Sequence, residues 1–292
     1  ANYIKSLVLN LQKQFSSLLM SKVLRQIVNM ALSEDIGTGD LSSSLLDDNI
    51  ANAKIICREK AIICGIDYSD LCFSTLDPDI EIDWKIKEGK EATPGAVICH
   101  LKGKSQAIIS AERTALNFLQ TLSATATQTK KLVSMIKHTN AKLLDTRKTI
   151  PNLRYAQKHA VKCGGGVNHR MGLFDCVLLK ENHILSIGSL ERSIEKALFK
   201  FPNKPVIVEI ESLDQLKIAL SIKDITRILC DNFSIQELIE AVAMAKGIYP
   251  LEISGNINEK NIIEYAETGV DFISIGSITK NIHSIDLSLR LV

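Results

Sequence analysis

The amino-acid sequence predicts an α/β protein with two domains, a small α+β domain followed by a parallel β/α barrel. Three observations support this prediction. The chain has 292 residues, about twice the ~150 residues of a typical domain. Its first third contains short apolar runs separated by turns, which are typical of a small antiparallel sheet. Its second half alternates apolar runs with amphipathic helical stretches, as a parallel sheet covered by helices does.

The first third begins with a helix and continues with strands. Apolar residues at helical spacing between Val23 and Ala31 precede a Gly-rich stop at residues 36–40. Residues 80–84 alternate between apolar and polar side chains, which indicates a half-buried strand. Helical periodicity returns over residues 110–137, and we expect this helix to link the two domains. The expected strands are residues 53–57, 61–66, 80–86 and 96–101.

The second half repeats a strand–helix unit, and its later strands begin about every twenty residues. The strands are continuously apolar, which indicates a sheet buried on both faces. We count six strands against the eight of a complete barrel, so a closed barrel and an open or incomplete one both fit. The expected strands are residues 143–144, 176–179, 206–210, 228–230, 251–253 and 272–275, and the expected helices are residues 190–199, 213–220, 235–245 and 262–268.

Composition and charge exclude several classes of protein. Hydrophobic residues make up 46% of the chain and charged residues 23%, which excludes a disordered chain, a collagen and a coiled-coil rod. The net charge of +2 gives no reason to expect a nucleic acid or an anionic membrane as partner. No apolar run reaches the ~18 residues of a membrane span.

The seven cysteines are expected to be buried, reduced thiols. They form no CxxC motif, and most have apolar neighbours in the sequence. Seven cysteines that are expected to stay reduced favour a reducing compartment, and the cytoplasm is the expected location. Residues 1–20 mix polar side chains into an apolar pattern and predict an amphipathic helix instead of a signal peptide.

Polar and mostly charged side chains follow each strand of the predicted barrel. The carboxyl ends of barrel strands share one face, where active sites form. Arg and Lys there would bind phosphate or carboxylate groups, and carboxylates would bind a divalent metal or sugar hydroxyls. Gly–Ser turns would offer backbone N–H groups to a phosphate. The sequence therefore predicts a site for a phosphorylated, polyanionic substrate, formed by residues 145–149, 180–183, 209, 211, 231–232, 254–256 and 276–277.

Two further segments have both a structural and a functional interpretation. The three glycines at 164–166 could simply end a helix, but they lead directly into His169 and Arg170. Arg113 follows Glu112 near the start of the linking helix, where an isolated Arg is more often solvated than functional.

Three of these segments carry a family resemblance. Residues 145–154 (DTRKTIPNLR), 164–170 (GGGVNHR) and 179–183 (LKENH) together resemble nicotinate-nucleotide pyrophosphorylase (carboxylating), also called quinolinate phosphoribosyltransferase. The resemblance covers nearly the whole chain after the first twenty or so residues. Asn152 stands where the family pattern has Gly, and Asn also tolerates left-handed backbone. The resemblance continues through residues 39–40, 112–117, 209–211, 231–232, 254–257 and 269–271.

The resemblance implies a type II phosphoribosyltransferase of NAD synthesis. The family joins quinolinate to phosphoribosyl pyrophosphate and releases pyrophosphate and CO₂, which gives nicotinate mononucleotide. The implied fold is an N-terminal α/β sandwich, here residues 1–117 with residues 281–292 returning to it, followed by an open, incomplete TIM-like α/β barrel, here residues 118–280. Mg²⁺ is the implied cofactor, and the implied assembly is a homodimer with the active site at its interface.

The same resemblance implies roles for individual residues. Quinolinate should be gripped, or its pocket lined, by cations of the barrel, and Arg113 should reach in from the partner chain. Lys148 and Lys180 should face the phosphates. Glu209 and Asp231 should hold the ribose hydroxyls, directly or through Mg²⁺. The expected catalytic residues are Lys148, Lys180, Glu209 and Asp231, and the other expected substrate-binding residues are Arg113, Thr146, Arg147, His169, Arg170, Ser254, Gly255, Asn256, Ile275, Gly276 and Ser277.

Two other functions stay open at this point. One is a related phosphoribosyltransferase with a different acceptor, such as a paralogue linked to molybdate transport or a nicotinate-using enzyme. The paired cation motifs favour a dicarboxylate acceptor instead. The other is a catalytically silent binding protein on the same fold, against which the complete set of charged strand-end residues argues.

Overall fold

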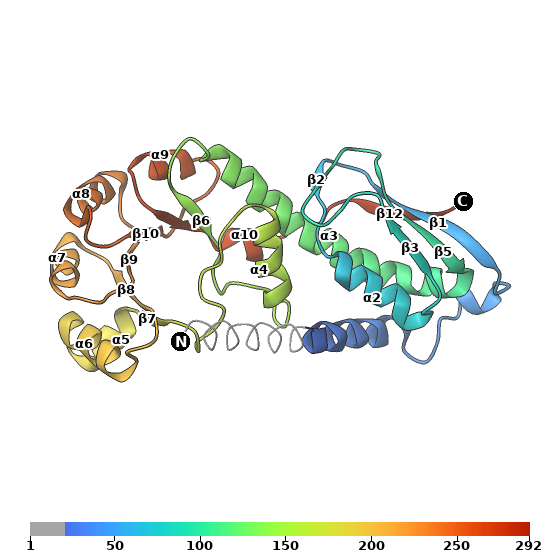
Figure 1. The fold of residues 1–292 in the computed structure, drawn as a ribbon, viewed down its shortest axis with the longest axis horizontal. Coiled ribbons are helices and arrows are strands. Elements are labelled where there is room, and N and C mark those ends of the chain that lie inside the picture. Colours follow the sequence, from blue (N-terminus) through green and yellow to red (C-terminus); the bar gives the residue numbers. More distant parts are fainter. Residues whose placement is uncertain (1–20) are drawn as a thin grey trace, which may run out of the picture. The chain divides into compact units, whose positions relative to one another are not determined.

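The computed structural model describes residues 21–292, which belong to two compact units (Figure 1). Among the described residues, the first unit consists of residues 21–124 together with His283–Val292, and the second is Thr125–Ile282. The division falls within the long helix α3 (Ser105–Met135), a little beyond the boundary expected between residues 117 and 118. The amphipathic helix expected for residues 1–20 lies outside the described residues.

An antiparallel sheet of four strands forms the centre of the first unit. β1 pairs with both β5 and β12, so the C-terminal strand joins a sheet built from N-terminal residues. Ala53, Ile55 and Cys57 of β1 are buried, because alternate side chains of a strand share one face. The strands in sheet order are β12 (Leu287–Leu291), β1 (Ile50–Cys57), β5 (Val97–Lys104) and β3 (Glu81–Trp84).

Helices complete the first unit. Residues 21–36 are helical and are followed by the short η1 (Ser43–Leu45), and α3 begins directly after β5. The strand expected at residues 61–66 is shorter than predicted. Only β2 (Ala61–Ile62) is extended, in a small ribbon with β4 (Glu91–Ala92), and the chain then turns into α2 (Ile66–Leu76). The turn is sharp because Gly65, with φ +104°, is in a conformation that favours glycine.

Six parallel strands form the sheet of the second unit, in the order β6-β11-β10-β9-β8-β7. β6 and β7 are the two edges of this sheet, so the barrel is open and incomplete, and the predicted fold class is confirmed. All six strands were predicted from their apolar runs. Their bounds are β6 (Lys142–Leu144), β7 (Val177–Leu179), β8 (Val206–Ile210), β9 (Arg227–Asp231), β10 (Leu251–Ser254) and β11 (Phe272–Ser274).

Helices cover the outer face of this sheet. Val206, Val208 and Ile210 of β8 pack into a large core that they share with the helices, because they lie on the same side of the strand. The bounds of the helices in the second unit are α4 (Arg154–Cys163), α5 (Glu181–Ile187), α6 (Leu190–Lys200), α7 (Leu213–Ser221), α8 (Ile235–Ala245), α9 (Ile262–Glu267) and α10 (Ser277–Lys280).

The inner face of the sheet carries a second, small apolar cluster. It contains Cys176, Ile207 and Leu229, with Leu178 packed against them. Because side chains alternate along a strand, the residue two positions after each of these strand residues also faces inward. That residue is Lys180 after Leu178, Glu209 after Ile207 and Asp231 after Leu229. The alternation therefore directs the charged strand ends into the interior of the barrel.

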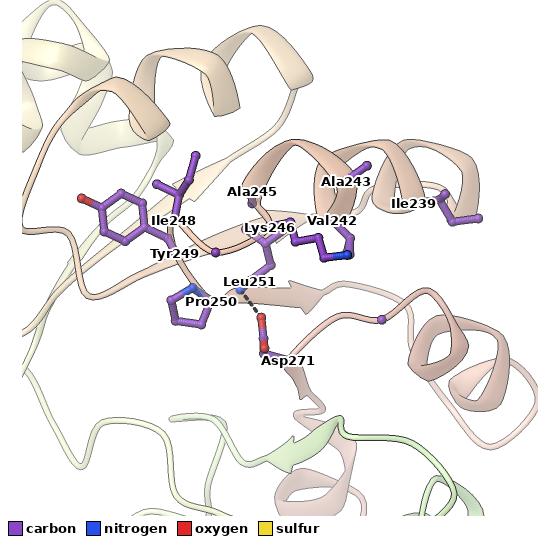
Figure 2. Close-up of a pocket in the computed structure, with 12 residues that line it drawn as sticks. Ile239, Val242, Ala243, Ala245, Lys246, Ile248, Tyr249, Pro250, Leu251 and Asp271 are labelled. Carbon is purple, nitrogen blue, oxygen red and sulfur yellow. Dashed lines mark hydrogen bonds between the residues drawn. The ribbon is translucent and has the colours of Figure 1, made fainter.

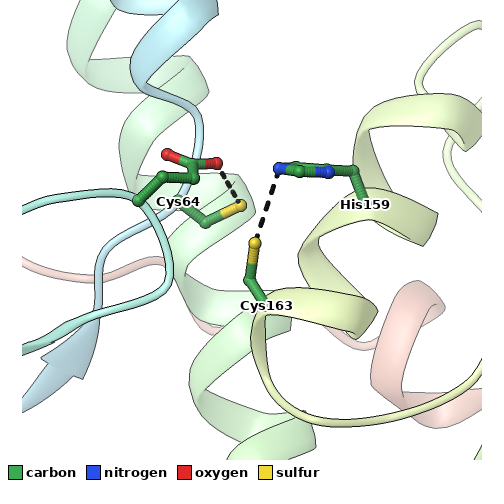
Figure 3. A group of neighbouring side chains, drawn as sticks. Cys64, His159 and Cys163 are labelled. Atoms are coloured by element: carbon green, nitrogen blue, oxygen red, sulfur yellow. Dashed lines mark hydrogen bonds between the residues drawn. The ribbon is translucent and has the colours of Figure 1, made fainter.

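Burial of the cysteines agrees with their expected role as small apolar residues. Six of the seven are buried, and Cys163 is partly exposed. Burial raises the pKa of Cys72, Cys99 and Cys230 to about 12 in each case. Figure 3 shows Cys163 on α4, with its Sγ 3.4 Å from Nε2 of His159 one turn earlier. Among the described helices, none is long and apolar enough to cross a membrane.

Candidate active site

The charged ends of β7 and β8 form an ion pair. Lys180 Nζ lies 2.7 Å from Glu209 Oε2. The register of the two strands pairs Leu178 with Ile207, so the inward-facing residues that follow them are neighbours. Lys180 keeps 46% of its side chain exposed while Glu209 keeps 13%, so the ammonium group remains accessible to a ligand. Asp231 follows on the next strand, and its Oδ2 accepts a hydrogen bond of 2.8 Å from Asn232 Nδ2.

The turn after β10 presents backbone instead of side chains. Gly255 and Asn256 both have positive φ, +101° and +53°, as does Asn232 at +57° in the neighbouring turn. A Cβ added to Gly255 would lie 2.1 Å from Asn232 Oδ1 and 3.1 Å from Asn232 N, so a side chain there would displace its neighbours. Asn232 N donates to Ser254 O at 2.8 Å and thereby ties the two turns together. The result is a tight surface of main-chain groups at the strand ends, suited to a phosphate.

The loop after β6 lies against the turn after β11. Lys148 N donates to Thr146 Oγ1 at 3.0 Å, and Lys148 O accepts from Thr279 Oγ1 at 2.8 Å. A Cβ on Gly276 would lie only 2.7 Å from Lys148 Cδ, so this glycine permits close approach. The expected residues Thr146, Lys148, Gly276 and Ser277 are therefore neighbours. Ile275 has its side chain in the outer core, and only its main chain can face the site.

A buried ion pair holds the backbone of two site loops together. Lys158 of α4 donates to Asp145 Oδ1, and both side chains are almost fully buried. Asp145 also accepts from Asn168 Nδ2 at 2.6 Å and from the backbone N–H of His169 at 2.9 Å. Burial is the main cause that raises the pKa of Asp145 and lowers that of Lys158, although each group opposes the shift of the other. The pair therefore fixes the start of the Arg147 loop relative to the His169–Arg170 segment.

The charge of one arginine expected in the quinolinate pocket acts on the other. Arg170 is half-buried, and its Nη1 donates to Cys176 O at 3.4 Å. Burial lowers the pKa of Arg170, and the positive charge of Arg147 lowers it further. Two like charges within electrostatic reach are unfavourable by themselves, and an anion between them relieves the repulsion. This arrangement is typical of a binding site for a dicarboxylate or a phosphate.

Two charged side chains that were not among the expected site residues, Arg154 and Asp175, hold the loops that follow β6 and α4. Arg154 donates through Nε to Thr149 Oγ1 at 3.1 Å and through Nη1 to Met171 O at 3.2 Å. Asp175 accepts from the backbone N–H groups of Met171 at 2.7 Å and Gly172 at 3.0 Å. Burial alone would raise the pKa of Asp175, but these N–H groups outweigh it and lower the pKa. Sequence patterns could not separate these residues from ordinary surface charges.

One cavity lies at the opposite end of the parallel strands. It has a volume of about 720 Å³ and is lined by the end of α8, residues 246–251, Gly269 and Asp271. Figure 2 shows Asp271 directed at the backbone of Leu251, to which its carboxylate is hydrogen-bonded at 2.8 Å. No expected site residue lines this cavity, so it is separate from the candidate site.

Comparisons with known proteins assign both parts of the chain to one family. Residues 40–123 match the domain described as "Quinolinate phosphoribosyl transferase, N-terminal domain", and residues 125–290 match "Quinolinate phosphoribosyl transferase, C-terminal domain". The chain belongs to the quinolinate phosphoribosyltransferase family. The resemblance expected from the strand-end motifs is thereby confirmed.

Full-length relatives support the same assignment. The nicotinate-nucleotide pyrophosphorylase of Francisella tularensis is 47% identical, with a TM-score of 0.91 over 93% of this chain and 96% of that chain. The chloroplastic rice (Oryza sativa subsp. japonica) nicotinate-nucleotide pyrophosphorylase [carboxylating] is 35% identical over 92% of this chain and 77% of the relative. The probable Bacillus subtilis enzyme of that name is 35% identical over 91% of this chain and 92% of the relative.

Two expectations for this member of the quinolinate phosphoribosyltransferase family concern Arg113, expected from a partner chain, and the metal ion Mg²⁺. Arg113 is exposed on α3 and belongs to the first unit, whereas the strand-end site belongs to the second. Glu209 and Asp231 offer carboxylate oxygens from the neighbouring strands β8 and β9, on the inner face. Mg²⁺ is commonly held by one or two carboxylates together with substrate phosphates, so this donor set fits Mg²⁺.

Proposed function

We propose that this chain catalyses the transfer of the phosphoribosyl group from phosphoribosyl pyrophosphate to quinolinate, with loss of CO₂, in the synthesis of NAD. The observation that carries the proposal is the Lys180–Glu209 pair on the inner face of the barrel. It places an accessible ammonium group beside a carboxylate, in the same unit as Arg147 and Arg170. A substrate pair with carboxylates, phosphates and ribose hydroxyls matches these three kinds of group. The full-length family relationship supports the same reaction.

Quinolinate is assigned to the cationic side of the site. Arg147 and Arg170 bind its two carboxylates, because a guanidinium fork matches a carboxylate and the like charges of this pair favour an anion between them. Lys180 faces the quinolinate pocket and also the phosphates. His169 lines the pocket. Its Nδ1 accepts from the backbone N–H of Arg170, and its Nε2 lies beside Glu252.

Phosphoribosyl pyrophosphate is assigned to the strand ends from β8 to β11. Glu209 and Asp231 hold the ribose hydroxyls, directly or through Mg²⁺. The main-chain turns at residues 254–256 and 276–277, with Thr146 and the main chain of Ile275, surround the 5′-phosphate. Lys148 faces the pyrophosphate. When bound, Mg²⁺ would neutralise charge on the departing pyrophosphate.

The chemistry requires no protein nucleophile. The pyridine nitrogen forms a bond to C1 of the ribose while the bond from C1 to the pyrophosphate oxygen breaks. The ring becomes a pyridinium cation, which takes up the electron pair when the adjacent carboxylate leaves as CO₂, and a proton then replaces that carboxylate. The side chains contribute by holding the two substrates in line and by stabilising the leaving charge.

The active unit is proposed to be a homodimer. In this arrangement Arg113 of one chain completes the quinolinate pocket of its partner, which gives the pocket one more cation. The exposed position of Arg113 on α3 is compatible with this role.

Incubation with quinolinate, phosphoribosyl pyrophosphate and Mg²⁺ tests the proposed reaction. Equal amounts of CO₂, pyrophosphate and nicotinate mononucleotide are expected. Turnover of nicotinate in place of quinolinate would indicate a related transferase with another acceptor. Quinolinate binding without any product would indicate a silent binding protein.

A further inference from the structure

Glu252 is a carboxylate in the interior of the barrel for which the proposed reaction gives no direct role. It is the second residue of β10 and is fully buried. It pairs in register with Leu229 of β9 and Phe272 of β11, so it lies one layer below the strand ends. Its surroundings include the apolar inner cluster of Cys176, Ile207 and Leu229. A charge in such a place is costly unless groups of opposite charge compensate it.

Two basic side chains approach the same oxygen of Glu252. Arg227 Nε lies 2.8 Å from Oε2, and the Arg227 guanidinium stacks 4.7 Å from the centre of the Phe272 ring. His169 Nε2 lies 3.4 Å from Oε2. Within residues 21–292 neither Glu252 oxygen has a hydrogen bond of good geometry, so these contacts are mainly electrostatic. Burial raises the pKa of Glu252, but His169 and Arg227 outweigh burial and lower it.

The hydrogen bond at the other nitrogen of the His169 ring indicates where the ring proton lies. His169 Nδ1 accepts a hydrogen bond of 2.7 Å from the backbone N–H of Arg170. A nitrogen that accepts from an N–H carries no proton, so the ring proton of neutral His169 lies on Nε2. The Nε2–H group lies beside the Glu252 carboxylate, 3.4 Å from Oε2. The imidazole is thus held between a buried anion and the main chain of Arg170.

We propose that Glu252 is a positioning residue for the quinolinate pocket. It holds His169 as the Nε2–H tautomer, Nδ1 then anchors the Arg170 backbone, and the anchored backbone aims the Arg170 guanidinium at a quinolinate carboxylate. Arg227 keeps Glu252 ionised from the other side. This inference rests on the proposed function, because it assigns Arg170 to quinolinate.

A purely structural ion pair would not need this arrangement. Buried ion pairs contribute little stability compared with well-packed apolar residues, and Arg227 alone supplies an opposite charge. The contact with His169 adds a link from the barrel interior to the adjacent loop residue, Arg170. Carboxylates that orient a functional imidazole in this way are common beside metal-binding histidines.

The principal test is the Glu252→Gln variant, measured by quinolinate binding and by steady-state kinetics. Loss of the carboxylate charge should raise the quinolinate Kd and KM by about 10- to 100-fold, the effect of weakening one charge-assisted contact. The Kd of phosphoribosyl pyrophosphate should change less than about twofold, since its proposed ligands are on other residues. Equal weakening of both substrates, or no change in either, would overturn the proposal.

A spectroscopic measurement reports the tautomer itself. In the wild-type protein, nitrogen-15 NMR of His169 should show a proton on Nε2 and none on Nδ1 at neutral pH. In Glu252→Gln this preference should weaken. A wild-type ring protonated on Nδ1 would contradict the proposal directly, whatever the kinetics show.

Two further variants separate positioning from folding. Arg227→Lys keeps the charge, so any rise in the quinolinate Kd should be smaller than the rise in Glu252→Gln. The double variant Glu252→Gln with Arg227→Met removes both charges together and should fold with a melting temperature near that of the wild type, yet bind quinolinate as weakly as Glu252→Gln. In a His169→Ala background Glu252→Gln should have no further effect on quinolinate affinity, and additive losses would overturn the inference. If wild-type protein failed to use quinolinate, the proposed function would fail instead.

Discussion

Lys180 Nζ and Glu209 Oε2 are 2.7 Å apart at the ends of adjacent parallel strands, on the inner face of an open barrel. The contact follows from strand register, because the two residues come directly after the paired positions Leu179 and Val208. It places a cation and an anion beside one another at the strand ends. Substrates that carry phosphates and hydroxyls can then each take one of the two partners.

Replacing Lys180 by Met should reduce kcat/KM by about 100- to 1000-fold, because a charged group that stabilises the leaving phosphates would be lost. Circular dichroism should be unchanged, since 46% of this side chain is exposed. Lys217→Met is the matched control. Lys217 Nζ lies 2.8 Å from Asp214 in an exposed pair on α7, and its loss should leave kcat/KM within about twofold. Comparable activity in both variants would contradict the site assignment.

Gly255→Ala tests the main-chain turn after β10. The added Cβ would lie 2.1 Å from Asn232 Oδ1 and 3.1 Å from Asn232 N, at a φ of +101°, so the Asn232 side chain or the turn must move. The KM for phosphoribosyl pyrophosphate should rise about tenfold or more, since displacing a strained turn typically costs one to several kcal/mol. Gly188→Ala has a similar positive φ, +110°, but nothing within 4 Å of the added Cβ. A similar KM increase in Gly188→Ala would show that the effect is not local to the site.

Lys158→Met should lower the free energy of unfolding by about 3–5 kcal/mol, because the buried Asp145 would lose its partner. Denaturant titration measures this loss. Lys162→Met on the same helix provides the control, since Lys162 is exposed, and should change the free energy of unfolding by less than about 0.5 kcal/mol. A Lys158→Met protein as stable as the control would mean that the pair contributes nothing to the fold.

Asp40 should make the free energy of unfolding of the first unit depend on pH in the acid range. Hydrogen bonds from the Ser43 backbone and hydroxyl, and from the Ser110 hydroxyl, lower its pKa from 3.8 to about 2. The folded state therefore binds this proton less readily than the unfolded state, so the stabilisation is present above pH 3.8 and disappears as the pH falls toward 2. Ser43→Ala should be less stable than the wild type at pH 7, and the difference should shrink in acid.

Ser44→Ala is the control for this acid dependence. The Ser44 hydroxyl donates to Leu41 O and does not contact Asp40. Denaturant midpoints of the Ser44 variant should run parallel to those of the wild type from pH 7 downward. If the denaturant midpoints of Ser43→Ala and wild type differed by the same amount at every pH, the pKa of Asp40 would not be lowered in the folded protein.

Arg113→Ala mixed with Lys180→Ala tests the shared site. Each variant alone should be inactive, because each site lacks one cation. In a mixed dimer one of the two sites would regain both groups and the other would lack both, so about half of wild-type activity per mixed dimer is expected. Inactive mixtures, with mixed dimers verified by mass spectrometry, would contradict the proposal that Arg113 crosses the interface.

The sequence predicted most of the parallel unit because its strands are buried on both faces and read as apolar runs. The charges at Lys180, Glu209 and Asp231 were predictable for a related reason, since they interrupt those runs at the carboxyl ends of strands. The prediction that β11 extends to residue 275 was one residue too long, because Ile275 continues the apolar run but lies past the last paired residue, Ser274.

Buried charges could not be predicted in the same way. Glu252 alternates with Leu251 and Ile253, so the local pattern is that of a strand with one solvated face. The other face is the barrel interior, which only the arrangement of all six strands creates. Lys158 likewise lies on α4 and is buried because the loops that contain Asp145 and Asn168 pack against it.

The most direct test of the central claim uses quinolinate labelled in the carboxylate on the ring carbon next to the nitrogen. Release of labelled CO₂ from this substrate is then measured. Wild-type protein with phosphoribosyl pyrophosphate and Mg²⁺ should release one CO₂ per nicotinate mononucleotide formed. Lys180→Met should reduce both products together by at least about 100-fold, while Lys217→Met releases CO₂ at the wild-type rate. Wild-type rates from Lys180→Met would contradict the assignment of the reaction to the strand ends of the barrel.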